Sequence, residues 1–305
     1  MCCLFGLMDH RGVLTVKQKN RMLSVLATAA EVRGTDATGI AYNSGGKLCI
    51  YKRPWPGHFM HFRVPADARV IIGHTRMTTQ GSAMRSCNNH PFPGRAGAMP
   101  FALAHNGMIH NDLTLRRELS LPSTRIETDS YIAAQLLEKK RALTFDSLRY
   151  MAEQVQGSFC FTVLDAEDTV YFVKGDNPLC IYRFQNGLYI YASTESILKH
   201  GLQLARMTLG KAEEIDLLCS EILRVDQSGR EERSVFNDAH LFRRSLYWPY
   251  DWHGLELDVT PKKTHLDDIK SVAKAYGYAP EQIDRLSELG FTTDELEELL
   301  YCGEL

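Results

Sequence analysis

The chain has 305 residues, of which 44% are hydrophobic and 24% are charged, and its formal net charge is -2. These are ordinary globular values, sufficient for one large domain with a smaller appendage. A charge near neutrality, without a long Lys/Arg run, argues against a nucleic-acid partner. The apolar stretches fall short of the roughly 20 residues that span a bilayer, and the N-terminal segment lacks a secretory signal. We therefore expect a soluble, cytoplasmic protein without a membrane partner.

The cysteines and histidines are scattered along the chain. The eight cysteines, at positions 2, 3, 49, 87, 160, 180, 219 and 302, form no CxxC pair and lack the density of a secreted disulfide scaffold. The eleven histidines show neither an HExxH motif nor zinc-finger spacing. We expect mostly buried thiols that pack as small apolar groups, no metal site and no cofactor.

The first two thirds of the chain contain strand-like runs and amphipathic helical patterns. Runs of strand-forming residues predict strands or hairpins in four segments: 2–8, 39–53, 68–76 and 101–109. Apolar residues at spacings of three and four predict helices over residues 16–32 and 128–141. A second strand-rich block, 157–193, contains Asn186-Gly187 as a tight turn. Because strands and helices come in blocks, we expect layered antiparallel sheets with helices packed outside.

The composition changes after about residue 235. We interpret residues 1–235 as one domain and residues 236–261, which are aromatic and interrupted by two prolines, as a linker. Three short helical patterns follow within residues 262–305. Their capping signals are Asp267, Pro280 and Thr292. This tail contains no catalytic signature, so we expect a small helical appendage or docking element.

Four segments between residues 33 and 130 combine glycine with Arg, His, Asn and Asp at predicted strand ends. They are "RGTDATGIA", "GHTRMTTQGSAMRSCNNHPF", "AHNGMIHN" and "ETDS". Glycine beside polar residues marks backbone that turns sharply or approaches a ligand closely. Any one of these segments alone could be an ordinary turn with a satisfied polar side chain. The set together supplies what acyl transfer on an amino acid amide requires.

Each part of that chemistry has a candidate residue. A terminal cysteine such as Cys2 carries its own base, because an α-amino group titrates at about 7.7 to 8.0 and can take the thiol proton. An Asn side chain and the next Gly N–H, as in Asn106 and Gly107, suit an oxyanion hole. Arg76 offers a planar fork for the carboxylate of a free amino acid, and Asp129 offers a countercharge for its ammonium group.

Six motifs in this order, "MCCLFG", "RGTDATGI", "IGHTRMTTQG", "NNHPF", "AHNGMIHN" and "ETDS", closely resemble the class II glutamine amidotransferase domain of the N-terminal nucleophile hydrolase superfamily. The resemblance covers roughly residues 2–230. It implies an α+β fold, a four-layer αββα sandwich, and an enzyme that hydrolyses glutamine to glutamate and ammonia. In this family the ammonia usually passes to a synthase domain or subunit.

The resemblance also implies residue roles. Cys2 matches the terminal nucleophile that forms a γ-glutamyl thioester, and it is exposed only when Met1 is removed. Asn106 and Gly107 match the oxyanion hole. Arg76 matches the residue that holds the glutamine carboxylate. Asp129 matches the ligand of the glutamine amino group.

Five further residues align with the family around this centre. Thr78 and His90 align with residues that form the substrate pocket. Arg33, Gly34 and Asp36 match the "RGxD" turn, which supports the surroundings of the nucleophile. For Arg33, a buried ion pair and a direct role in the site both remain open.

The chain departs from the family pattern in three ways. Cys3 stands where the family usually has glycine; we expect a buried packing thiol that crowds the backbone beside the nucleophile. Met77 stands where many relatives carry an aromatic residue, which predicts a softer pocket wall. After residue 235 there is no phosphosugar isomerase-like region, phosphoribosyltransferase loop or ATP-binding glycine-rich signature.

We therefore expect a standalone class II glutaminase that supplies ammonia to a separate synthase partner. One alternative keeps the mechanism but acts on a larger γ-glutamyl amide or peptide. Another is a non-catalytic scaffold that retains the fold and binds partners through the C-terminal helices.

Overall fold

The computed structural model describes residues 2–239, residue 241 and parts of the segment 266–299. The chain divides into two compact units, Met1–Leu241 and Phe242–Leu305. The first unit contains two antiparallel sheets, and the predicted active-site residues all belong to it.

The first sheet has seven strands. They are β1 (Cys3–Asp9), β2 (Ala37–Ser44), β3 (Lys47–Arg53), β4 (Val70–Arg76), β9 (Cys180–Phe184), β10 (Leu188–Ala192) and β11 (Ala212–Glu214). Their order is β11-β9-β10-β1-β4-β2-β3, and every pairing is antiparallel. Strand β1 therefore lies in the middle of the sheet, with Cys3 opposite Thr75 of β4.

The second sheet has six strands. They are β5 (Phe92–Ala96), β6 (Met99–Ile109), β7 (Gly157–Asp165), β8 (Val170–Lys174), β12 (Glu221–Val225) and β13 (Glu231–Val235). Their order is β13-β12-β8-β7-β6-β5, again with antiparallel pairing throughout. Strand β5 pairs with β6 only over residues 99–103, so the later part of β6, which carries Asn106 and Gly107, continues beyond β5.

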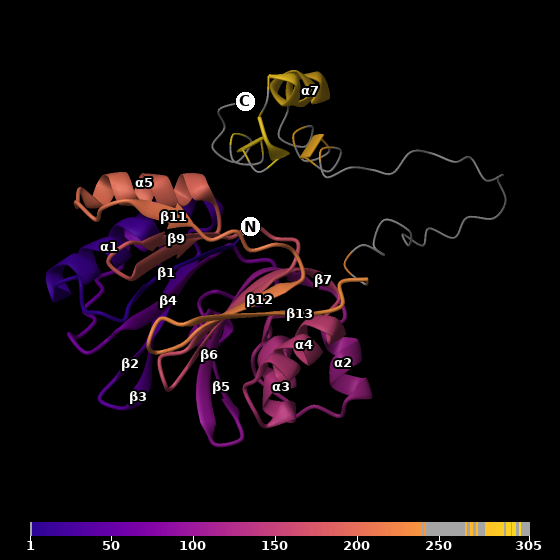
Figure 1. The fold of residues 1–305 in the computed structure, drawn as a ribbon. Helices are drawn as coiled ribbons and strands as arrows, with labels where there is room; N and C mark the ends of the chain where they lie inside the picture. Colours follow the sequence, from indigo (N-terminus) through magenta and orange to yellow (C-terminus); the bar gives the residue numbers. More distant parts are fainter. Residues whose placement is uncertain are drawn as a thin grey trace. The chain divides into compact units, whose positions relative to one another are not determined.

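Helices cover the outer face of each sheet. Helices α1 (Val16–Ala29) and α5 (Glu195–Ala205) lie on the first sheet, and α2 (Asp112–Glu118), α3 (Tyr131–Lys140) and α4 (Phe145–Gln154) lie on the second, as Figure 1 shows. Three short 3-10 turns complete the unit: η1 (Ala30–Arg33), η2 (Gly57–Phe59) and η3 (Ser86–Asn88). The predicted four-layer αββα sandwich is confirmed.

Three apolar layers hold the sandwich together. The first lies between α1, α5 and the first sheet, and the third lies between the second sheet and its helices. The middle layer joins the inner faces of the two sheets and includes the fully buried Leu4, Met8, Ile72, Phe172 and Tyr191. Strand alternation makes this possible, because successive side chains point to opposite faces.

The predicted strands and both predicted helices are present, with changes at the helix ends. The helix predicted over residues 16–32 ends at Ala29, after which residues 30–33 tighten into η1. The helix predicted over residues 128–141 begins at Tyr131, and the Asp129 carboxylate before it accepts a hydrogen bond from the backbone of Ile109 on β6. Helices α2, α4 and α5 were not predicted.

The second unit is described only in part. Helix α7 (Pro280–Glu288) has its predicted proline at the first helical position, and Thr292 forms a reciprocal cap with Glu295. A small apolar cluster contains Ile269, Ala273, Ile283 and Leu296. Asp267 and most of the predicted linker lie outside the described residues, so the boundaries proposed from the sequence stay predictions.

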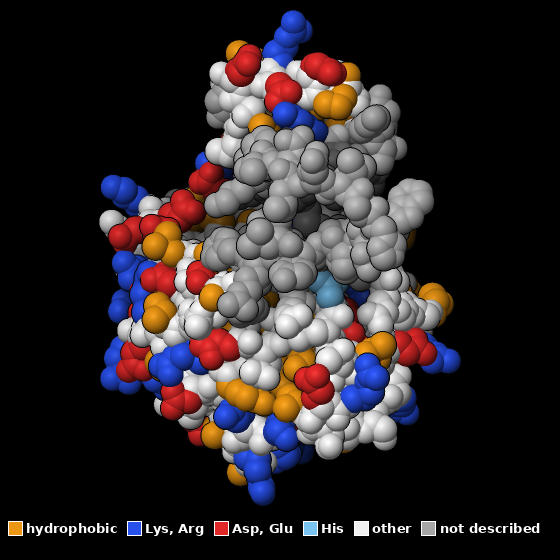
Figure 2. All heavy atoms as spheres, turned by 90° about the vertical axis from the view of Figure 1, so that its right-hand side faces the viewer, with side chains coloured by type: hydrophobic (Ala, Val, Ile, Leu, Met, Phe, Trp, Pro, Cys, Tyr) orange, Lys and Arg blue, Asp and Glu red, His pale blue; other side chains and the backbone are white. Residues whose placement is uncertain are grey.

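The surface of the described residues gives two further observations. Lys and Arg side chains are interspersed with Asp and Glu on the face drawn in Figure 2, so that face has no extended region of one sign. Within the described part of the chain, no helix is long and apolar enough to cross a membrane.

The middle layer provides a stability test. Met8 is fully buried between the sheets, so Met8→Ala should lower the free energy of unfolding by about 2–5 kcal/mol. Met84 is 78% exposed, and Met84→Ala should change it by no more than about 0.5 kcal/mol. Denaturant unfolding of both variants checks the difference; equal effects would contradict the layer assignment.

Candidate active site

Cys2 lies directly before β1 at the centre of the first sheet, and it is half-buried. Its Sγ is 3.6 Å from the carbonyl oxygen of Met77, to which it donates. Arg33, which is 8% exposed, donates from Nε to the Cys2 carbonyl oxygen at 3.2 Å. Two loops that are distant in sequence therefore fix the residue predicted to be the nucleophile.

The surroundings of Cys2 favour a neutral thiol. Burial raises the pKa of the Cys2 thiol, and the Asp129 carboxylate adds to the increase. The hydrogen bond to Met77 and the positive charge of Arg76 act in the opposite direction. Because the net shift is upward, attack by this sulfur requires a base that removes its proton.

Asn106 and Gly107 lie side by side on β6, in the second sheet. The buried Asn106 carboxamide donates from Nδ2 to Ser193 Oγ at 3.4 Å, and Leu4 N donates to the same oxygen at 2.8 Å. Ser193 thus connects the strand that follows Cys2 to the side chain of Asn106.

Only glycine fits at position 107. Its φ is +141°, outside the range that side chains readily adopt, and a Cβ there would lie 2.0 Å from the carbonyl oxygen of Ser158. The backbone of β6 therefore passes very close to β7 at this point. Because glycine has no side chain, residue 107 does not shield its own backbone N–H.

Arg76, the last residue of β4, is 2% exposed. It donates from Nη1 to Asn89 Oδ1 at 2.6 Å, and from Nη2 to the carbonyl oxygens of Gln80 and Gly81, the latter at 3.2 Å. Burial lowers the pKa of Arg76, while Cys2, Asp36 and Asp129 oppose that shift. The predicted fork is thus near the nucleophile but is occupied by protein oxygens.

Asp129 is held against the strand that carries Asn106. One carboxylate oxygen accepts a hydrogen bond from Ile109 N at 2.6 Å, and the other accepts one from Ser130 Oγ at 3.3 Å. Asp129 is 6% exposed, and its charge acts on both Cys2 and Arg76. The predicted ammonium ligand therefore belongs to the same group of residues.

The "RGxD" turn supports the start of the loop after Arg76. A Cβ on Gly34 would lie 2.6 Å from Met77 N, so the two backbones are in direct contact. Asp36 accepts a hydrogen bond from Thr78 N at 2.7 Å. The Thr78 residue itself is exposed on the surface of this loop.

His90 is packed under the site. Its ring lies 4.1 Å from that of His74 and 4.3 Å from that of Phe92, measured between centroids. Both ring nitrogens are buried without a hydrogen-bond partner among the described residues. Burial lowers the pKa of His90 well below its usual value, so the ring is neutral near pH 7. In the described part of the chain, no group of three or more His, Cys, Asp or Glu side chains is placed to hold a metal ion.

Lys52 supports the segment that contains Asn89. Its Nζ donates to the carbonyl oxygens of Asn89 and Pro91, the latter at 3.0 Å. Burial lowers the pKa of Lys52 to about 8, and the charge of Arg76 contributes in the same direction. Lys52 thus supports Arg76 through Asn89, whose side chain accepts the Arg76 hydrogen bond.

The two departures at Cys3 and Met77 have different surroundings. Cys3 is fully buried in the layer under α1 and α5, which confirms the predicted packing thiol, and its Sγ donates to the Leu4 carbonyl oxygen at 3.2 Å. Met77 is 41% exposed, and its backbone carbonyl oxygen lies 3.6 Å from the Cys2 sulfur.

Sequence reasoning missed Ser193, Asn89 and Lys52. Asn89 belongs to the "NNHPF" motif that was recognised, which could have suggested it. Ser193 follows β10 and Lys52 belongs to β3, and neither carries a local sequence signal.

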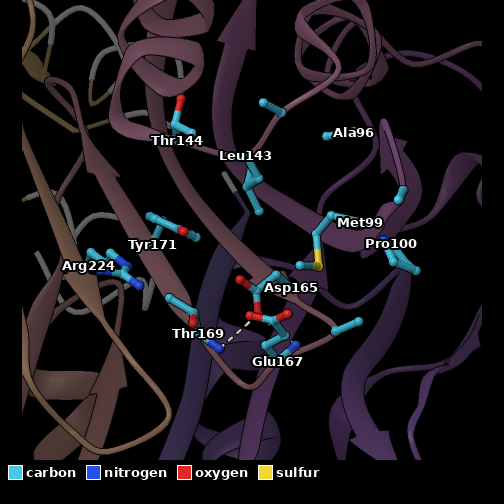
Figure 3. Close-up of a pocket in the computed structure, with 13 residues that line it drawn as sticks. Ala96, Met99, Pro100, Leu143, Thr144, Asp165, Glu167, Thr169, Tyr171 and Arg224 are labelled. Atoms are coloured by element: carbon cyan, nitrogen blue, oxygen red, sulfur yellow. Dashed lines mark hydrogen bonds between the residues drawn. The ribbon is translucent and has the colours of Figure 1, made fainter.

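A pocket of about 640 Å³ lies at the opposite end of β6 from Asn106. Its polar lining residues, drawn in Figure 3, are Thr144, Asp165, Glu167, Thr169, Tyr171 and Arg224. Asp165 Oδ1 accepts a hydrogen bond from Thr169 N at 2.9 Å within the β7–β8 turn. Met99 of this pocket and Asn106 are seven residues apart on one strand, or about 24 Å. The pocket is separate from the candidate active site.

Comparison with known proteins identifies the domain. A family model for a glutamine amidotransferase domain matches residues 74–200, which include Arg76, Asn106 and Asp129 but not Cys2. The isomerizing glutamine–fructose-6-phosphate aminotransferase of Chlamydia muridarum is 29% identical over 220 residues, 69% of this chain and 35% of that protein. The enzyme of the same name from Geobacillus kaustophilus is 32% identical over 191 residues, 59% of this chain and 30% of that protein.

A solved structure shows the same fold. Glutamine phosphoribosylpyrophosphate amidotransferase from B. subtilis, complexed with ADP and GMP, matches 77% of this chain and 49% of its own, with a TM-score of 0.61 and 21% identity.

The fold is that of this amidotransferase, an α+β sandwich of two antiparallel sheets with helices outside. The chain carries a class II glutamine amidotransferase domain, which is an enzyme domain. It spans about a third of the length of the curated relatives named above.

Lys52 gives a pH test of the site's support. The folded protein binds the Lys52 proton more weakly than the unfolded chain, whose lysines titrate at about 10.4. The deprotonation of Lys52 should therefore make the free energy of unfolding increase as the pH rises from about 8 to about 10. Lys52→Met should lack this increase, whereas Lys47→Met, at an exposed position, should keep it. Denaturant unfolding across this range is the measurement; parallel curves for wild type and Lys52→Met would contradict the assignment.

Proposed function

We propose that this domain hydrolyses the side-chain amide of glutamine to glutamate and ammonia, with Cys2 as nucleophile. The observation that carries the proposal is the Ser193 hydroxyl, which accepts hydrogen bonds from both Leu4 N and Asn106 Nδ2. It holds an oxyanion donor of the second sheet close to the start of β1, where Cys2 lies.

The reaction follows from these groups. After Met1 is removed, Cys2 Sγ attacks the glutamine γ-carbonyl carbon and its proton passes to the Cys2 α-amine. The tetrahedral oxyanion accepts hydrogen bonds from Asn106 Nδ2 and Gly107 N. The amine returns the proton to the leaving nitrogen, and ammonia departs from a γ-glutamyl thioester. Water then cleaves the thioester, which releases glutamate and restores the thiol.

Arg76 and Asp129 bind the two charged groups of the substrate's α-carbon. The glutamine carboxylate replaces the Gln80 and Gly81 carbonyl oxygens as an acceptor for Arg76, because an anion is the stronger acceptor for a guanidinium. The Asp129 carboxylate accepts from the substrate ammonium group, since the hydrogen bonds from Ile109 N and Ser130 Oγ leave lone pairs on its oxygens free. Thr78 borders the pocket from the exposed surface of its loop, and the buried His90 supports the pocket from beneath.

The relatives support a partner that uses the ammonia. Two of them are named as aminotransferases that pair glutamine with fructose 6-phosphate. This chain matches about a third of their length, so ammonia passes from this domain to a synthase that the matched region does not include.

A larger γ-glutamyl amide is the second candidate substrate. Met77, whose backbone carbonyl accepts from Cys2 Sγ and whose residue is 41% exposed, favours it, because a flexible thioether leaves more room than an aromatic ring for groups beyond the amide nitrogen.

The two opening cysteines provide the decisive comparison. Cys2→Ala should abolish ammonia release from glutamine while far-UV circular dichroism stays unchanged, because the nucleophile is lost and no core atom is removed. Cys3→Ala should retain ammonia release, because its sulfur lies in the helix-side core. Glutaminase activity that persists in Cys2→Ala would end the proposal.

Intact mass gives the matching chemical test and addresses the scaffold alternative. The electrophilic glutamine analogue 6-diazo-5-oxo-L-norleucine should add one adduct, on Cys2, to protein that has lost Met1. Absence of an adduct on such protein would favour a non-catalytic scaffold.

Substrate size separates the two enzyme candidates. Glutamine should be turned over with a higher kcat/KM than γ-glutamyl dipeptides, and Met77→Trp should reduce the dipeptide reaction more than the glutamine reaction. Ammonia or amine release measured for both substrates checks this; a preference for dipeptides would favour the second candidate.

A further inference from the structure

Asn177 lies in the connection between β8 and β9. Its side chain contacts the predicted oxyanion pair, Asn106 and Gly107, which belongs to strand β6. Its Nδ2 donates to the carbonyl oxygen of Asn106 at 2.9 Å. The same nitrogen is 2.6 Å from the position that a Cβ on Gly107 would occupy. The Asn177 side chain therefore lies directly against the Asn106–Gly107 peptide.

The backbone that carries Asn177 is fixed to β7. Gly175 N and Asn177 N donate to the Phe159 carbonyl oxygen at 3.1 and 3.4 Å, and Asp176 Oδ1 accepts from Phe159 N at 2.9 Å. Phe159 is the register partner of Gly107. The β8–β9 connection is thus anchored to Phe159, which lies opposite Gly107, and Asn177 contacts the peptide of Gly107.

This bond determines the direction of the Gly107 amide. In a planar trans peptide the C=O and N–H groups point in opposite directions, so holding the Asn106 carbonyl also holds the Gly107 N–H. Glycine restricts its own dihedral angles less than any other residue, and here its φ is +141°. The Asn177 donor therefore restrains this peptide in addition to the pairing of β6 with β7.

Two residues at the open end of the β9–β10 hairpin contact Asn106. Asn177 precedes β9 and Ser193 follows β10, and Cys180 of β9 pairs with Ala192 of β10, so the two residues flank the same open end of the hairpin. Ser193 contacts the Asn106 side chain, and Asn177 contacts the Asn106 carbonyl.

We propose that Asn177 is a positioning residue for the oxyanion hole, acting through the Asn106–Gly107 peptide and not on the substrate itself. The inference rests on the proposed glutaminase activity. Both tetrahedral intermediates, in thioester formation and in thioester hydrolysis, place their oxyanion at this peptide. Misalignment of the Gly107 amide therefore slows both steps and leaves the binding of glutamine in its ground state unchanged.

The test compares Asn177→Ala and Asn177→Asp with wild type. Each should lower kcat by about ten-fold with KM unchanged, a smaller loss than the roughly 10²- to 10³-fold cost of removing an oxyanion donor outright. Asn177→Asp should lose at least as much as Asn177→Ala, because a carboxylate cannot donate to the Asn106 carbonyl and repels it. Rates are normalised to the extent of Cys2 labelling by 6-diazo-5-oxo-L-norleucine, so that inactive molecules do not count.

Asn111→Ala is the matched control. Asn111 follows the same strand, β6, and donates from Nδ2 to the Gln154 carbonyl oxygen, also at 2.9 Å, but it does not contact the Asn106–Gly107 peptide. If losing such a bond has a purely structural effect, Asn111→Ala should also show it, as a lower melting temperature or a smaller labelled fraction. The normalised kcat of Asn111→Ala should stay unchanged.

The outcomes are separable. If wild type releases no ammonia and takes no label, the proposed function fails. If wild type is active and the Asn177 variants keep its normalised kcat, or change KM instead, the positioning role is overturned while the glutaminase activity stands. A kcat loss confined to the Asn177 variants supports the proposal.

Discussion

The hydroxyl group of Ser193 joins the two sheets at the point where the candidate site forms. It accepts one hydrogen bond from Leu4 N, in the first sheet, and one from the Asn106 carboxamide, in the second. All three residues are fully buried, where an unpaired polar group costs free energy, so the arrangement resists separation of its members. The proposed nucleophile and the proposed oxyanion donors thus belong to different sheets, and one buried acceptor links the strands that carry them.

Burial also sets the charge state around this centre. It raises the pKa of Cys2 and lowers that of Arg76, while His90 stays neutral beneath them. A neutral thiol in such surroundings gains little from the Arg76 guanidinium, whose donors already face protein oxygens. The activating base in the proposed reaction therefore has to belong to the nucleophile itself, and the α-amine meets this requirement without a further buried charge.

The sequence was sufficient to predict the sandwich and to propose most residues of the candidate site. Periodicity identified the main strands, and the ordered motifs identified Cys2, Arg76, Asn106 and Asp129, which the structure brings together. Ser193 and Asn177 could not be found this way. Their bonds to Asn106 join residues 87 and 71 positions apart, and they depend on how two sheets pack and on how one hairpin ends. Local patterns specify which face a side chain occupies, whereas such contacts follow only from the assembled layers.

The same packing explains why two adjacent cysteines differ. Along β1, Cys3 and Phe5 point into the layer beneath the helices, whereas Leu4 and Met8 point towards the second sheet. Extending this alternation by one residue gives Cys2 the direction of Leu4, towards the sheet that carries the predicted oxyanion donors. The thiol that replaces the family's glycine at position 3 is therefore accommodated in an apolar layer on the far side of the sheet. Strand geometry alone thus allows a second cysteine beside the nucleophile without placing a second sulfur in the site.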